Sequence, residues 1–163
     1  MRLFAIAIVL TLATTPAVAA AQGAPPSDSG AVIGVVQRFF DAMSHRDTTA
    51  ARATMVSGAQ LVSIVSGSNA AAPRRESDSS FIARLVTDKK GFLERMWNPR
   101  VRVEGDIAEL WTPYDFHLGG KFSHCGIDAF TLLRTAKGWQ IASIAYTVQR
   151  TGCAASPLGP PTS

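Results

Sequence analysis

Apolar and polar residues follow two different periods along this chain, helical near the start and strand-like in the second half. Residues 31–44 place apolar side chains at every third or fourth position, which predicts an amphipathic helix with one buried stripe. Asp47 suits the N-cap position of a second helix, which we expect to run from residue 48 to about residue 55. The folded part of the chain is therefore expected to open with two helices.

Short apolar segments separated by turn-forming residues fill the middle of the chain. Segments of this length, bounded by Gly, Asn and Pro, are typical of short strands and helices joined by loops. The predicted elements are, in order, a strand at residues 60–65, a loop at 66–80, a third helix at 81–86 capped by Ser79 or Ser80, and strands at 91–97 and 100–104.

Residues 107–150 alternate strand formers with turn residues in the order of two consecutive β-hairpins. A reversal centred on Gly119-Gly120 would place each residue of the first strand opposite a defined partner, and paired side chains would share one face. The expected pairs are His117 with Phe122, Asp115 with His124, and Trp111 with Asp128. One face should then carry Trp111, Asp115, His117, His124, Asp128 and Phe130.

The opposite face of these hairpins is expected to be apolar. A large apolar face is rarely left in contact with water, so the pattern predicts a homodimer through this outer surface of the sheet. The residues assigned to it are Leu110, Tyr114, Phe116, Cys125, Ile127, Ile144, Tyr146 and Val148.

The order of the elements, helices first and antiparallel strands afterwards, predicts an α+β fold. We expect a curved antiparallel sheet with the N-terminal helices packed on its concave face. Where the helices do not fill that face, a pocket should remain.

The N-terminus has the pattern of a secretory signal peptide, with one arginine, a short apolar run and small residues before the expected cleavage site. We predict a signal peptide at residues 1–21, cleaved after Ala19 or Ala21, and a flexible leader at 22–30. The folded domain is expected at 31–150 and a flexible tail at 151–163. This pattern predicts export to the periplasm or the medium, with no membrane segment left after cleavage.

Composition narrows the classes of function further. The chain has 16 basic and 12 acidic residues, and removal of Arg2 with the signal peptide leaves 15 against 12, a net charge of +3. The basic residues are scattered, which argues against nucleic-acid binding. Cys125 and Cys153 could form a disulfide in an exported protein, but the chain would have to fold back after the last strand. The alternative is a buried thiol and a free cysteine in the tail.

Four segments resemble the nuclear transport factor 2-like superfamily, the cone-shaped α+β fold that includes ketosteroid isomerases, polyketide cyclases and scytalone dehydratase. They are VVQRFFDAMSHRD in the first helix, GDIAELW at the entry to the sheet, YDFHLGGKFSHCGIDAFTLLR, and GWQIASIAYTVQR. Within this superfamily the likeness is to the bacterial SnoaL-like and lumazine-binding-like proteins. The resemblance implies a cystatin-like cone, and this fold hosts enzymes, binding proteins and scaffolds.

Ketosteroid isomerases use an Asp base with an oxyanion hole made of a Tyr and a protonated Asp. In this chain the position of the helix Tyr falls at Phe39, which has no donor, and the position of the Asp base falls near Ser63. Only Asp128 matches the family's strand Asp. The resemblance therefore does not imply steroid isomerisation by that mechanism.

Three interpretations of the polar face stay open. His124 could carry a proton, oriented by Asp115, with Asp128 acting at the substrate; the alternative is a satisfied polar pair on a pocket wall. Asp115, His117 and His124 could also form a metal site, but no ligand spacing supports it, so we assign no metal and no cofactor. The expected apolar lining consists of Trp111, Phe130, Phe39, Phe40 and Trp139.

The leading functional prediction is an exported protein whose pocket binds a small, mainly apolar molecule. The first alternative is an isomerase, cyclase or dehydratase that uses the His-Asp cluster. The second is a dimeric, non-catalytic interaction module with a filled cone. An open cavity with His124 and Asp128 on its wall would favour the first two.

Overall fold

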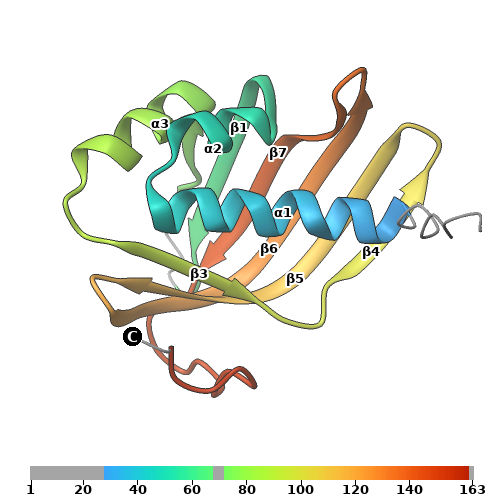
Figure 1. Ribbon diagram of the computed structural model, residues 1–163. Helices are drawn as coiled ribbons and strands as arrows, with labels where there is room; N and C mark the ends of the chain where they lie inside the picture. Colours follow the sequence, from blue (N-terminus) through green and yellow to red (C-terminus); the bar gives the residue numbers. More distant parts are fainter. Residues whose placement is uncertain (1–27, 68–71, 162–163) are drawn as a thin grey trace, which may run out of the picture.

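The structure is a computed structural model and describes residues 28–67 and 72–161; the predicted signal peptide lies outside these residues. Within them, helices cover one side of a curved, unclosed seven-stranded sheet (Figure 1). The elements are α1 (Asp28–His45), α2 (Thr48–Ala53), β1 (Met55–Val65), β2 (Arg74–Ser77), α3 (Asp78–Thr87), β3 (Phe92–Met96), β4 (Arg100–Glu104), β5 (Ile107–Leu118), β6 (Lys121–Thr135) and β7 (Gly138–Val148).

The sheet order is β2-β1-β7-β6-β5-β3, with β4 also paired to β5. All of these pairs are antiparallel except β1 with β7, which is parallel and brings the start of the sheet beside its end. The predicted α+β class, with N-terminal helices on the concave face, is confirmed.

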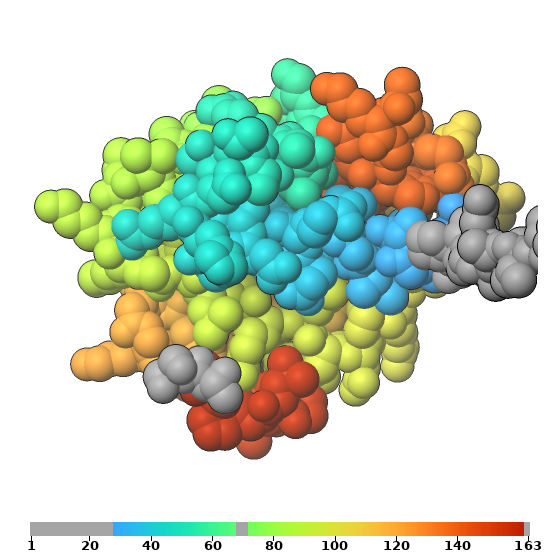
Figure 2. All heavy atoms as spheres, in the orientation of Figure 1, coloured from blue at the N-terminus to red at the C-terminus, as the bar shows by residue number. Residues whose placement is uncertain are grey.

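Helix α1 crosses the concave face and supplies much of the core (Figure 1). Four residues of its apolar stripe are at most 2% exposed: Val32, Val36, Phe39 and Phe40. The stripe packs against inward residues of the central strands, and Figure 2 shows the helices hiding most of the sheet from this side. The helix begins at Asp28, three residues before the expected start at residue 31.

The connection between β1 and the third helix differs from the prediction. Residues 74–77, expected within a loop, form β2 because their backbone pairs with the edge of β1. The N-cap of α3 is Ser77, whose Oγ accepts a hydrogen bond from Ser80 N at 3.2 Å, and not Ser79 or Ser80. Asp47 caps α2 as predicted, since its carboxylate accepts the Ala50 N–H at 2.9 Å.

The predicted hairpin register is wrong over most of its length, because β6 contains a β-bulge at Ser123. At the tip His117 does pair with Phe122, but the next pair is Phe116 with His124. One extra residue on one strand moves all later partners by one position and to the other face. Asp115 therefore pairs with Cys125, and Asp128 pairs with Thr112.

This bulge exchanges many of the predicted faces. Leu110, Tyr114 and Phe116, assigned to the outer surface, point inward with His124 and Asp128, whereas Trp111 and Asp115 point outward. On β7, Ile144, Tyr146 and Val148 also line the concave side. Of the outer face as predicted, the register keeps only Cys125 and Ile127 there.

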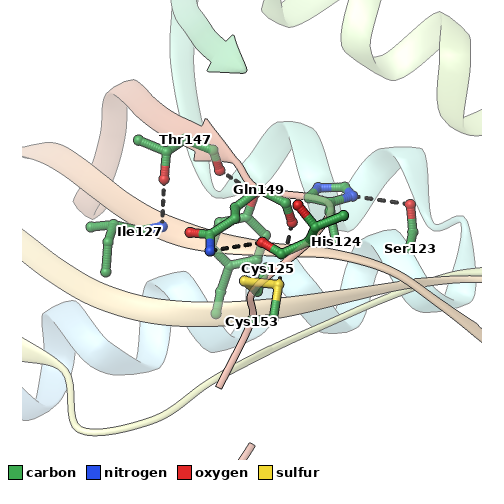
Figure 3. Close-up of a disulfide and its surroundings, with 9 residues drawn as sticks. Ser123, His124, Cys125, Ile127, Thr147, Gln149 and Cys153 are labelled. Carbon is green, nitrogen blue, oxygen red and sulfur yellow. Dashed lines mark hydrogen bonds between the residues drawn. A yellow bond between two sulfur atoms is a disulfide. The ribbon is translucent and has the colours of Figure 1, made fainter. Parts of the chain in front are cut away.

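A disulfide joins Cys125 of β6 to Cys153, with 6.0 Å between their Cα atoms (Figure 3). The chain does fold back after β7. Gln149 first pairs with Cys125 through two backbone hydrogen bonds of 2.8 and 3.0 Å, and Gly152 then adopts a left-handed φ of 72° that reverses the chain. Residues 151–161 consequently lie on the side of the sheet away from α1 (Figure 1).

None of the helices in residues 28–67 and 72–161 is both long and apolar enough to cross a bilayer.

Candidate functional site

A cavity of about 470 Å³ lies between the helices and the concave face of the sheet. Its walls come from α1, α3 and six of the strands, so that residues distant in the sequence meet there. The residues that line it are Phe39, Phe40, Met43, Leu61, Ser63, Val65, Ala72, Arg74, Glu76, Phe81, Arg84, Asp88, Phe92, Glu94, Tyr114, Phe116, Leu118, His124, Asp128, Phe130, Ile144, Tyr146, Val148 and Arg150.

Aromatic rings form most of the apolar wall. Phe39 of α1 stacks on Phe81 of α3 with 5.3 Å between ring centroids and meets Phe130 of β6 edge-on at 6.4 Å. Phe92 and Phe116 lie 5.8 Å apart on the neighbouring strands β3 and β5. Packed rings of this kind give a fixed apolar surface. Because the rings are already ordered, the protein loses little conformational entropy when a ligand binds to them.

Two carboxyl groups, Glu94 of β3 and Asp128 of β6, meet inside this apolar wall. Asp128 is 1% exposed and Glu94 is half-buried, and their side chains are hydrogen-bonded to each other. Two carboxylates are both acceptors, so this bond requires a proton on one of them. Among the described residues no other donor reaches Asp128 Oδ2. The pair therefore holds at least one proton.

Burial is the main cause of the raised pKa values of the two acids in this pair. Burial raises the pKa of Glu94 to about 7, while the bond to Asp128 and the charge of Arg84 act in the opposite direction. Burial and the nearby Glu94 raise the pKa of Asp128 well above its ordinary value. At neutral pH the cavity thus contains a carboxylic acid that can donate a hydrogen bond.

His124 lies on the same concave wall, but it is a neutral imidazole. Burial and, to a smaller extent, the positive charge of Arg150 together lower its pKa to about 4. Its ring stacks on Phe116 at 4.9 Å, and its Nδ1 lies 3.0 Å from the Ser123 hydroxyl (Figure 3). An imidazole with so low a pKa is a poor proton carrier at neutral pH.

An ion pair between Arg84 and Glu76 forms part of the cavity lining. Arg84 of α3 donates two hydrogen bonds to Glu76 of β2, at 3.0 and 2.9 Å, and its guanidinium lies over the rings of Phe81 and Phe92 at 5.3 and 5.7 Å. Arg84 is held by both carboxylate oxygens of Glu76 and by two aromatic rings, so its guanidinium has a defined position. Its charge is already compensated by Glu76.

Asp115, predicted to orient His124, belongs to a different site on the outer face. Its carboxylate accepts two hydrogen bonds from Arg95, at 2.9 and 2.6 Å, and lies 3.4 Å from Nε2 of His117. Although burial acts in the opposite direction, Arg95 holds the pKa of Asp115 below its ordinary value, and Ser156 of the C-terminal segment also bonds to it. The predicted Asp115–His124 pair therefore does not form.

The other predicted residues divide between the cavity and the outside. Phe39, Phe40 and Phe130 line the cavity as expected. Trp111 is 54% exposed on the outer face, because the bulge reverses its direction, and Trp139 lies beneath Arg134, 4.4 Å from the guanidinium and away from the cavity. Neither tryptophan is part of the lining.

The three residues of the metal interpretation are also separated. Asp115 and His117 lie together on the outer face, whereas His124 lines the cavity. Within the part of the chain that the structure describes, no three His, Cys, Asp or Glu side chains come close enough to hold a metal ion.

Sequence reasoning missed Glu94, although a signal for it was present. Glu94 sits between Phe92 and Met96 in β3, and residues two apart share a face of a strand. An acid between two apolar residues at this spacing indicates a carboxyl group on the apolar side of a sheet. The positions compared with the ketosteroid isomerases, Phe39, Ser63 and Asp128, all line the cavity.

Comparison with known proteins identifies the fold but no activity. No family model matches the chain, and no curated protein matches it in sequence. A nuclear transport factor 2-like protein with a cystatin-like fold from Novosphingobium aromaticivorans superposes with a TM-score of 0.60 at 17% identity, over 80% of this chain and 87% of that one.

Two further structures agree. A nuclear transport factor 2-like protein from Cytophaga hutchinsonii gives a TM-score of 0.64 at 8% identity, over 76% of this chain and 99% of that one. A candidate dehydratase of the same family from Streptomyces avermitilis gives 0.57 at 14% identity, over 72% and 92%. At these identities the likeness concerns the fold alone. The chain has the cone-shaped fold of the nuclear transport factor 2-like superfamily.

Proposed function

We propose that this protein binds a small, mainly apolar molecule in its cavity and orients it by a hydrogen bond from the Glu94–Asp128 pair. The observation that supports this most is the contact between two carboxyl side chains, Glu94 and Asp128, in the lining of an aromatic cavity of about 470 Å³. Such a volume is in the range of small-molecule sites, and a few polar groups in an apolar lining are typical of them. The open cavity also disfavours the filled-cone alternative.

The preferred ligand has an aromatic or alicyclic body and an uncharged acceptor, such as a carbonyl group. A protonated carboxyl donates a hydrogen bond to that acceptor, whereas an anion placed there would meet the negative charge of the pair. Ligand binding should therefore depend on the proton of the pair. A neutral acceptor ligand is expected to bind more weakly as the pH rises through 7.

Equilibrium binding of 2-naphthamide, followed by calorimetry, tests this proposal. Wild type should bind the amide, and Ile144→Trp, which adds bulk to the cavity wall, should abolish binding without loss of the fold by circular dichroism. Trp111→Ala, on the outer face, is the matched control and should bind like wild type. Equal binding by the wild type and the Ile144→Trp variant would show that the amide does not occupy the cavity.

Acid and base catalysis of the isomerase or lyase type is the second candidate function. The acid pair favours it, because a group with a pKa of about 7 can both accept and donate a proton at neutral pH. In this version Glu94 takes the place of the predicted His124 and Asp115, and Asp128 keeps its predicted role. Conversion of a bound enolisable ketone in ²H₂O, monitored by deuterium exchange, would support it, and Glu94→Gln should remove the exchange.

We also propose that the protein is exported. A disulfide between Cys125 and Cys153 is consistent with an oxidising compartment, since stable disulfides are rare in the cytosol of most cells. Expression of the full chain, followed by mass analysis of the secreted or periplasmic fraction, would test this. A mature N-terminus at residue 20 or 22 is expected, and an uncleaved cytosolic product would contradict it.

A homodimer through the outer sheet face remains part of the proposal, with different residues from those predicted. Ile107, Trp111 and Leu133 are 47%, 54% and 39% exposed on β5 and β6. Sedimentation analysis should give a dimer at micromolar concentration, and Trp111→Arg should shift it to monomer. A wild-type monomer would remove this part of the proposal.

A further inference from the structure

The opening of the cavity carries positive charge, whereas the acid pair lies deep inside it. The two ends of a bound ligand would therefore meet different chemical groups. Four of the lining residues are exposed to solvent, namely Val65, Ala72, Arg74 and Arg150. They mark the boundary between the cavity and water. Both charged members of this group are arginines.

The register of the sheet places each arginine at the end of a row that begins near the acid pair. Asp128, Tyr146, Ser63 and Arg74 are successive partners across β6, β7, β1 and β2. Because neighbouring strands lie about 4.8 Å apart, the first and last of these backbones are about 14 Å apart. The row therefore runs from the buried acid to the solvent boundary.

The second row runs from Glu94 through Phe116 and His124. Cys125 pairs with Gln149, which puts Arg150 opposite His124 in the antiparallel ladder. The effect of the Arg150 charge on the His124 imidazole agrees with this position. Arg150 thus faces the cavity from the same wall as His124.

Within residues 28–67 and 72–161, neither arginine has a carboxylate partner. Among the described residues, the ion pairs involve Arg84, Arg95, Arg134 and His117, and no carboxylate lies within 4.0 Å of Arg74 or Arg150. Apart from the acid pair, the acids of the cavity lining are Glu76 and Asp88, and both already have partners. Glu76 binds Arg84, and Asp88 accepts a hydrogen bond from Lys90 N at 2.8 Å.

We propose that Arg74 and Arg150 select, among the apolar molecules that the cavity binds, those with an anionic group at the solvent end, so that an amphipathic carboxylate binds more tightly than a neutral molecule of the same shape. The inner end repels an anion, because the acid pair there carries negative charge when it loses a proton, whereas the outer end attracts one. The ligand class is an apolar or aromatic acid whose carboxylate remains at the opening. This inference rests on the proposed binding function.

Matched probes separate the two ideas. 2-Naphthoate and 2-naphthamide have the same ring system, but only the first is an anion at pH 7.5. Wild type should bind the carboxylate more tightly than the amide, and Arg74→Gln and Arg150→Gln should each weaken carboxylate binding roughly two- to fivefold, as expected for one exposed charge pair. Amide binding should be unchanged in both variants.

Arg75→Gln is the matched control, because Arg75 is the neighbour of Arg74 on β2, is exposed and does not line the cavity. It should not change the affinity for either probe. Equal affinity of wild type for the two probes, or an equal effect of Arg75→Gln, would overturn the selection of anions and leave the proposed function intact. Absence of binding of both probes would overturn both.

Discussion

The hydroxyl group of Tyr114 donates a hydrogen bond of 2.8 Å to the backbone carbonyl of Thr147, reaching from β5 across β6 to β7. Gly126 makes this possible, since it pairs with Tyr114 and has no side chain beneath the ring. A Cβ at this position would overlap Thr147 O and lie 2.7 Å from Cε1 of Tyr114. Position 126 of β6, the strand between the two residues, must therefore be glycine.

Gly126→Ala should strongly destabilise the fold, by roughly 3 kcal/mol, because backbone or the buried Tyr114 ring must move. Tyr114→Phe should cost about 1 kcal/mol, since it removes one hydrogen bond but keeps the ring. Urea unfolding measures both. Gly120→Ala is the comparison. At this turn an added Cβ meets no atom within 4 Å, so the variant measures only the cost of replacing a glycine with positive φ. A Gly126→Ala variant as stable as wild type would show that Tyr114 does not lie over this position.

Asp128→Asn should flatten the dependence of stability on pH. A carboxyl whose pKa is raised in the folded state binds its proton more tightly there, so its favourable contribution is full below the unfolded pKa near 4 and is lost as the pH rises toward the folded pKa. Wild type should thus lose stability between pH 4 and pH 8 through the acid pair. Thermal unfolding at several pH values should show a smaller loss in Asp128→Asn, and parallel curves would contradict the proton held by the pair.

Glu94 should titrate close to neutrality. A ¹³C NMR titration of the side-chain carboxyls is expected to show one glutamate with a midpoint near pH 7. Asp128→Leu should move that midpoint upward, because the hydrogen bond from Asp128 favours the ionised form of Glu94 and leucine has no donor. A Glu94 midpoint near 4.5 in wild type would contradict the buried pair.

Cys153→Ser should destabilise the chain by about 3 kcal/mol, since the disulfide closes a loop across 28 residues. The C-terminal segment should also become more accessible, with faster hydrogen exchange at residues 154–160. Ser156→Ala, which removes the bond to Asp115 but keeps the disulfide, is expected to have a much smaller effect. If reduction left both stability and exchange unchanged, the disulfide would not hold this segment.

Asp115 should contribute to stability except in acid. Its pKa is lowered in the folded state by Arg95, so its contribution is present above the unfolded pKa near 4 and is lost as the pH falls through the lower folded pKa. Asp115→Asn should therefore be less stable than wild type at pH 6 but converge with it near pH 2. Acid titration of unfolding in both proteins provides the comparison.

The fold was predictable because helical and strand periods are local properties of the sequence. The cavity-lining residues Phe39, Phe40 and Phe130 followed from the same periods, as did His124 and Asp128. The bulge at Ser123 was not predictable in this way, since nothing local marks the extra residue and the pairing of β6 with β5 and β7 decides it. For the same reason β2 was missed: it is a strand only because β1 offers an edge.

The polar site shows the same division. Asp128 was found, but its partner Glu94 was not, because β5 lies between their strands and the two residues have different partners on it, Phe116 and Thr112. Asp115 was assigned to the wrong face by a single residue of register. Side-chain chemistry was therefore readable from the sequence, whereas the grouping of those side chains needed the tertiary structure.

The even-numbered residues His124, Asp128 and Phe130 of β6 face the cavity, but on the other side of Ser123 the even-numbered Phe122 is opposite the outward His117. A second register shift in β7, at Ala142, has the same effect between Ile141 and Ile144. A complete substitution scan would detect each shift as a change in which residues, odd-numbered or even-numbered, tolerate polar side chains. Tolerance of polar residues should alternate along each strand and then invert at positions 123 and 142, which makes the two bulges visible without a structure.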